Sequence, residues 1–155
     1  MKGNPRIVAH LQKLLSGKLV ALDQFLLHAR MYDDWGFSKL GARTEKALSE
    51  ERRHTDLLMR RMLFLGSTPD MAQREVLQPG STARDMLHHD LQLEYRLTEQ
   101  LRTAIACCIE ERDFQTHLVL GELLCDTEED HTYWLEQQLG LIDALGIENY
   151  LGAQL

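Results

Sequence analysis

Apolar residues recur at spacings of three and four along almost the whole chain of 155 residues, and this is the period of an amphipathic α-helix. Four long segments carry the pattern: residues 7–35, 38–65, 82–110 and 114–139. In the fourth segment the apolar stripe is predicted to include Phe114 and Leu118. A short fifth helix is expected within Asp143–Gln154, entered at Gly146. No internal repeat or second domain is visible, so residues 1–155 are predicted to form a single all-α domain.

A long polar segment separates the second and third predicted helices. Residues 66–81, GSTPDMAQREVLQPGS, contain two of the three prolines and two of the ten glycines. Loops beyond roughly 12–15 residues are uncommon unless something requires their length. A four-helix bundle with a crossover has such a requirement, because the chain must pass from one end of the bundle to the other. The sequence therefore predicts a four-helix bundle with a long crossover between its second and third helices.

The charge balance limits the partners of this domain. Its 24 acidic and 17 basic residues give a formal net charge of -7. Such a surface repels nucleic acids and anionic lipids and attracts cations, so neither a nucleic acid nor a membrane is expected as a partner. No stretch approaches the ~18 apolar residues of a membrane span, and no apolar run of signal-peptide length is found near Met1. The cytoplasm is therefore the expected location.

Two Glu-x-x-His pairs, Glu51–His54 and Glu128–His131, are the feature that carries chemistry. Residues three apart share one face of a helix, so each pair can hold a metal ion through a carboxylate oxygen and an imidazole nitrogen. Each pair also falls at the spacing of the apolar stripe of its own helix. All four side chains are therefore predicted to point into the core.

The third helix adds a carboxylate to the same core. Glu94 lies three residues after Leu91 and three before Leu97, again on the apolar stripe. Three carboxylates and two imidazoles in one core form either a buried network of ion pairs and hydrogen bonds or a metal site that compensates their charge. The spacing favours the metal, because di-iron bundles use one Glu from each of two helices and a Glu-x-x-His pair from each of the other two.

The first helix departs from this ligand pattern. Its core stripe passes from Leu14 through position 18 to Leu22, and position 18 is a lysine, Lys18. The helix contains no glutamate, and Asp23 points about 100° away from the stripe. A cation therefore occupies the place where the di-iron pattern requires a sixth, anionic ligand.

Several segments of the chain resemble the ferritin family, and within it the bacterioferritins. They are MKGNP followed by LQKLL, LLHARMYDDWGF, RRMLFLG, DTEEDHTYWLE and IENYLGAQL, and together they span the whole chain. The resemblance implies a ferritin-like four-helix bundle with a short fifth helix. It also implies a hollow shell of 24 subunits that stores iron as a ferric mineral, with a ferredoxin as the electron donor for iron release.

By this resemblance, five of the six ferroxidase ligand positions are occupied, by Glu51, His54, Glu94, Glu128 and His131. In active members of the family, Glu51 and Glu128 are expected to bridge two irons. Glu94 and His131 then bind one iron, and His54 binds the other together with a glutamate of the first helix.

Five positions differ from the pattern of the family. Lys18 stands at the first-helix ligand position, and Arg52 stands where bacterioferritins carry the methionine that binds haem. Phe25 replaces a tyrosine near the di-iron centre, and Lys46 and Glu50 occupy an altered inner-surface iron site. Non-haem iron is therefore the expected ligand, and haem is not expected.

Three functional hypotheses follow. The leading one is a bacterioferritin-type iron-storage subunit whose ferroxidase site is impaired by Lys18. Its shell is either homomeric or mixed with a sister subunit that has the missing ligand and the methionine. The second is a fully active ferroxidase from which Lys18 swings away, and the third is a purely structural subunit of a mixed shell. The number of irons bound at the predicted cluster distinguishes them.

Overall fold

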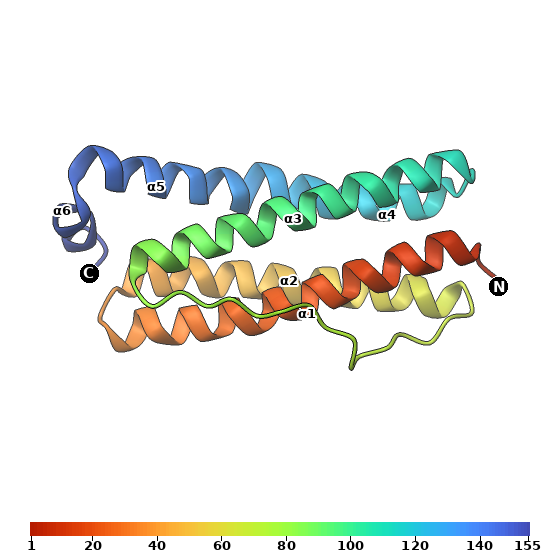
Figure 1. Ribbon diagram of the computed structural model, residues 1–155, viewed down its shortest axis with the longest axis horizontal. Helices are drawn as coiled ribbons and strands as arrows, with labels where there is room; N and C mark the ends of the chain where they lie inside the picture. Colours follow the sequence, from red (N-terminus) through yellow and green to blue (C-terminus); the bar gives the residue numbers. More distant parts are fainter.

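The computed structural model describes residues 1–155 as four long helical rods lying side by side (Figure 1). The first three rods are α1 (Pro5–Asp34), α2 (Ser38–Phe64) and α3 (Ala83–Glu110). The fourth consists of α4 (Phe114–Cys125), the π-helix η1 (Asp126–Thr132) and α5 (Tyr133–Leu145), and the short α6 (Ile147–Gly152) follows it. The prediction of an all-α four-helix bundle with a short C-terminal helix is thereby confirmed.

Local sequence determines where the helices begin and end. Asn4 caps α1, because its side chain accepts a hydrogen bond from the backbone N–H of Arg6 and a proline occupies the first helical position. Thr82 caps α3 by accepting a hydrogen bond of 3.2 Å from the backbone N–H of Asp85. Gly146 adopts a φ of +79°, which turns the chain from α5 into α6.

The predicted crossover is present between α2 and α3. The segment runs along the outside of the bundle from one end to the other, so that α3 runs parallel to α2 (Figure 1). Two attachments to α1 hold it in place. Gln12 exchanges hydrogen bonds of 2.8 and 2.9 Å with the backbone of Asp70. Closer to α3, the backbone N–H of Gly80 donates to Nε2 of the buried His28 at 3.0 Å.

The fourth rod buries a different face before η1 than after it. Phe114 and Leu118 were predicted in the core, but they are 55% and 64% exposed, and Thr116 and Leu120 are buried instead. That prediction was wrong because it assumed the α-helical period throughout. Hydrogen bonds in a π-helix join residues five apart, so η1 rotates the turns before it relative to those after it. Beyond η1, Leu135 is buried as the stripe predicts.

The core has a polar centre between two apolar ends. Apolar side chains from several helices pack into one cluster at each end of the bundle. Lys18, His54, Glu94 and His131 each lie near the middle of their rod and are no more than 6% exposed. No helix combines the length and the apolar composition that crossing a lipid bilayer requires.

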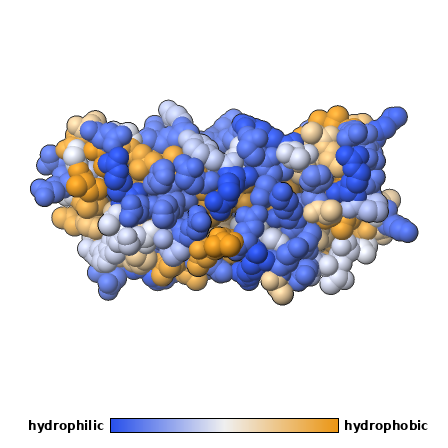
Figure 2. Space-filling model, in the orientation of Figure 1, coloured by the Kyte–Doolittle hydropathy of each residue, from blue (hydrophilic) through white to orange (hydrophobic).

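Apolar patches interrupt a mostly hydrophilic surface at both ends of the face drawn in Figure 2 and near its middle. At the end of α2, Leu63 and Phe64 are 59% and 52% exposed. Phe64 and Val119 of α4 line one shallow hollow, so the exposed ends of α2 and α4 adjoin. Several exposed apolar side chains on adjoining helices indicate a contact surface.

Candidate metal centre

A buried ion pair lies where the predicted ligands converge. The ammonium Nζ of Lys18 is 3.1 Å from Oε1 and 3.0 Å from Oε2 of Glu51. Lys18 is 0% exposed and Glu51 is 3% exposed. Burial raises the pKa of Glu51 to about 7, although Lys18 acts in the opposite direction. Lys18 therefore points into the predicted ligand cluster, as its position on the stripe implied.

Glu94 is a buried carboxylate without hydrogen bonds. It is fully closed off from solvent, and neither of its carboxylate oxygens has a hydrogen-bond partner. Nδ1 of His131, which also has no partner, lies 3.8 Å from Oε2 of Glu94. Burial alone would raise the pKa of Glu94, but His131 and Lys18 outweigh it and lower the pKa. A carboxylate and an imidazole that lie side by side without partners are suited to binding a divalent metal ion.

Aromatic packing fixes the ring of His131. The edge of Phe25 meets it at a centroid distance of 4.9 Å and an interplanar angle of 81°. Trp134 stacks on it at 6.1 Å and 13°. The guanidinium of Arg43 lies 4.8 Å from the centre of the Trp134 ring and forms a 3.0 Å ion pair with Asp130. The ring is thereby oriented beside Glu94 in advance of any ligand.

His54 lies between two carboxylates. Its Nδ1 is 3.7 Å from Oε1 of Glu51 without a hydrogen bond, whereas its Nε2 is 3.0 Å from Oδ2 of Asp126. Burial and the nearby positive charge of Lys18 lower the pKa of His54 to about 4, so the ring is neutral at pH 7. Glu50, His54 and Asp126 bring one potential ligand atom each to within 4.8 Å of one another. This second group could hold a cation beside the buried centre.

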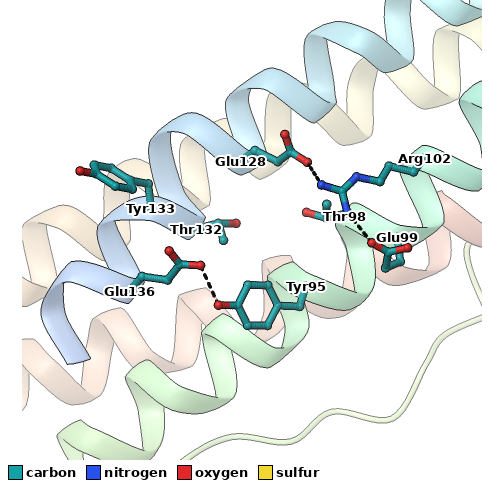
Figure 3. Close-up of a pocket in the computed structure, with 8 residues that line it drawn as sticks. All are labelled: Tyr95, Thr98, Glu99, Arg102, Glu128, Thr132, Tyr133 and Glu136. Carbon is teal, nitrogen blue, oxygen red and sulfur yellow. Dashed lines mark hydrogen bonds and ion pairs between the residues drawn. The ribbon is translucent and has the colours of Figure 1, made fainter. Parts of the chain in front are cut away.

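Glu128 does not join the other predicted ligands. It lies in η1, its side chain is 35% exposed, and its Oε1 accepts a 2.5 Å hydrogen bond from Arg102 (Figure 3). Thr127, which is 1% exposed, faces the core in its place. The shift of face that η1 introduces accounts for this outward direction. The structure thus brings together four of the five predicted ligands, Glu51, His54, Glu94 and His131.

Two polar features of the core were not anticipated from the sequence. Asp126 next to His54 belongs to η1, whose winding the helical period cannot reveal. Asp90 accepts a 2.8 Å hydrogen bond from Gln24 and lies 2.9 Å from Nδ1 of His28. Its spacing, four residues before Glu94 on the same helix, could have placed it in the core.

Comparison with known proteins agrees with this architecture. The family model described as Ferritin-like domain matches residues 8–145. A bacterial ferritin of Synechocystis sp. is 47% identical over 155 residues, which are 100% of this chain and 99% of the relative. A bacterial ferritin of Pseudomonas aeruginosa is 48% identical over the full length of both chains. A bacterioferritin of Mycobacterium avium is 35% identical over 97% of this chain and 94% of the relative. The chain therefore belongs to the ferritin family.

Proposed function

We propose that this chain is a bacterioferritin-type iron-storage subunit whose ferroxidase site takes up one iron instead of two, because Lys18 substitutes for the second. The observation that carries the proposal is the contact of the Lys18 ammonium with both carboxylate oxygens of Glu51. Glu51 is one of the two bridging ligands implied by the family pattern. The ammonium thus holds the oxygens that a second iron would need.

Electrostatics favours the lysine over a second metal ion. The core contains the carboxylates of Glu51 and Glu94, and His54 is available as a neutral ligand. The positive charge of one ammonium and one divalent ion already exceeds the negative charge of the two carboxylates. A second divalent ion would therefore be repelled by Lys18 without a further carboxylate to compensate it. At 4 Å, each pair of like unit charges costs about 4 kcal/mol at an effective dielectric constant near 20.

The remaining iron is assigned to the side of Glu94 and His131. The two unpartnered oxygens of Glu94 and the unpartnered Nδ1 of His131 support this assignment. Glu128 can complete the site only after it leaves Arg102. Ferrous iron gives up one electron, whereas reduction of O₂ to hydrogen peroxide requires two, so a one-iron site is expected to oxidise iron slowly.

Assembly into a 24-subunit shell, homomeric or mixed with a sister subunit, belongs to the same proposal. The exposed Leu63 and Phe64 of α2 and Phe114 and Leu118 of α4 support an oligomer, because they remain uncovered in the single chain. A sister subunit with a complete ferroxidase site would supply the rapid oxidation that this subunit lacks. The stored product would be a ferric mineral.

Oxygen-dependent oxidation of Fe(II), followed by stopped-flow absorbance, tests the proposal. Lys18→Glu removes the ammonium and restores a carboxylate ligand, so we expect at least a tenfold faster first turnover than in the wild type. Lys18→Gln removes only the charge and should give an intermediate rate. It serves as the test variant if Lys18→Glu folds poorly without metal. Lys13→Glu makes the same charge change at an exposed position of α1 and should have no effect. A wild-type rate equal to that of Lys18→Glu would overturn the proposal.

A further inference from the structure

A polar pocket lies on the outer side of η1, next to the candidate iron site. It occupies about 340 Å³ between α3 and the η1–α5 segment (Figure 3). Three carboxylates line it, those of Glu99, Glu128 and Glu136, and the guanidinium of Arg102 is the single cation among the lining residues. The pocket is therefore negatively charged and open to solvent.

Two buried hydroxyl groups in this pocket lack partners. Thr98 of α3 and Thr132 of η1 line it and are only 6% and 7% exposed. Neither Oγ1 atom makes a hydrogen bond within the protein. Figure 3 shows the two side chains pointing toward one another between the helices. Buried hydroxyls without a partner cost free energy, so this pair points to a ligand that donates or shares hydrogen bonds.

The two threonines also connect the pocket to the candidate iron site. Thr98 follows Glu94 by one helical turn on α3, and Thr132 is the next residue after His131. Glu94 and His131 are the unpartnered groups assigned to the iron. The threonines thus mark the boundary between the open pocket and the closed centre.

We infer that this pocket binds a hydrated divalent cation, which then passes between Thr98 and Thr132 to Glu94 and His131. Six water molecules, at roughly 30 Å³ each, need about 180 Å³, so a fully hydrated ion fits the pocket. Its water ligands can donate hydrogen bonds to the carboxylates and to the two threonine oxygens. This inference rests on the proposed function, because it supplies the ferrous ion that the centre takes up.

The ion pair between Arg102 and Glu128 gives the pocket a means of passing the ion on. Arg102 bridges Glu99 and Glu128, and its side chain is 55% exposed and free to move into solvent. A divalent ion offers Glu128 twice the charge of the guanidinium and therefore competes with it. Once released from Arg102, Glu128 can turn with the ion toward Glu94 and complete its coordination.

Counting bound Mn²⁺ by electron paramagnetic resonance tests the pocket independently of the centre. In Glu94→Gln, where the centre is disabled, the pocket should still bind one Mn²⁺ per subunit. Adding Thr98→Val and Thr132→Val, which preserve side-chain shape and remove only the unpartnered hydroxyls, should reduce the count by one. Glu122→Gln, an exposed position on the same rod, should not change it. An equal count with and without the two valines would overturn the inference.

The rate of iron arrival gives a second, kinetic test. With Glu94 intact, Thr98→Val/Thr132→Val should slow the first oxidation of Fe(II) at least fivefold while the equilibrium number of ferrous ions at the centre stays unchanged. An unchanged rate would contradict passage through the pocket. The proposed function would fail by a different result, namely a wild-type centre that holds two irons or none. The difference in Mn²⁺ count between the Glu94→Gln variants with and without the two valines does not depend on that number.

Discussion

The Lys18 ammonium lies 3.0 and 3.1 Å from the two carboxylate oxygens of Glu51, and both side chains are shut off from solvent. The ammonium donates a hydrogen bond to Oε1 and lies at ion-pair distance from Oε2, so it stands where a metal ion bound to Glu51 would lie. The chain thus keeps the ferritin bundle, and Lys18 supplies part of the positive charge that compensates the carboxylates at its centre.

Removal of the Lys18 charge should destabilise the metal-free protein. Lys18→Met leaves Glu51 buried beside Glu94 without a cation, and breaking a buried ion pair in this way typically costs about 3–5 kcal/mol. The expected result at pH 8 is a lower midpoint of thermal unfolding. Lys18→Met/Glu51→Leu removes both charges and should recover most of the loss. If the double variant lost as much in the midpoint of thermal unfolding as Lys18→Met alone, Lys18 would act through packing alone.

Acid should weaken the protein through His54. Its pKa is lowered from 6.5 to about 4 in the folded state, so the unfolded chain takes up the proton first as the pH falls. The stability that neutral His54 contributes is complete above pH 6.5 and is lost toward pH 4, by up to about 3 kcal/mol. Glu51, whose pKa is raised to about 7, acts in the opposite direction over part of this range.

The difference between wild type and His54→Gln isolates the contribution of His54 from that of Glu51. Wild type should unfold at a higher temperature than His54→Gln at pH 7, and this difference in midpoint should decrease as the pH is lowered to 4. The exposed His88→Gln serves as the control, and its difference from wild type should be independent of pH. A constant advantage for wild type over the whole range would contradict the lowered pKa.

The C-terminal helix should be needed for assembly. Tyr150 of α6 is 1% exposed, and its hydroxyl donates a 2.7 Å hydrogen bond to Gln138 of α5. Deletion of Ile147–Leu155 removes this anchor and uncovers apolar surface at the end of the bundle. Size-exclusion chromatography should then show smaller or heterogeneous particles, whereas deletion of the exposed Leu155 alone should not. Unchanged particles after the longer deletion would exclude a role for α6 in assembly.

Haem binding should depend on position 52. Arg52 has no thioether, and its guanidinium is permanently charged, so purified protein mixed with haem should show no bis-methionine absorption spectrum. Arg52→Met supplies the missing ligand and is expected to gain that spectrum, while Arg60→Met on the same helix is not. Stoichiometric haem in the wild type, lost in Arg52→Ala, would contradict this prediction.

The fold was largely predictable because each helix carries a regular apolar stripe. The crossover also followed from residues 66–81, which are too long and too polar for a tight turn. The π-helix was not predictable, because one sequence with a nearly regular period does not reveal where an extra residue is accommodated. That single irregularity explains the exposure of Phe114 and Leu118 and the outward direction of Glu128.

The centre was predictable where residues lie on regular helix. Glu51, His54, Glu94 and Lys18 are buried as their spacing indicated, since three α-helices without interruption present them. Contacts that join distant helices were harder to foresee. The pairing of Arg102 with Glu128 depends on the winding of η1 against α3, and no pattern within either helix encodes it.

The most direct test of the central claim is the number of ferrous ions whose tight binding depends on Glu94, measured by anaerobic calorimetric titration of metal-free wild type and of Glu94→Gln. The two proteins should differ by one ion per subunit, since an ion in the outer pocket is retained in both. Lys18→Glu should bind one ion more than wild type. A difference of two ions between wild type and Glu94→Gln would contradict the claim that Lys18 takes the place of one iron.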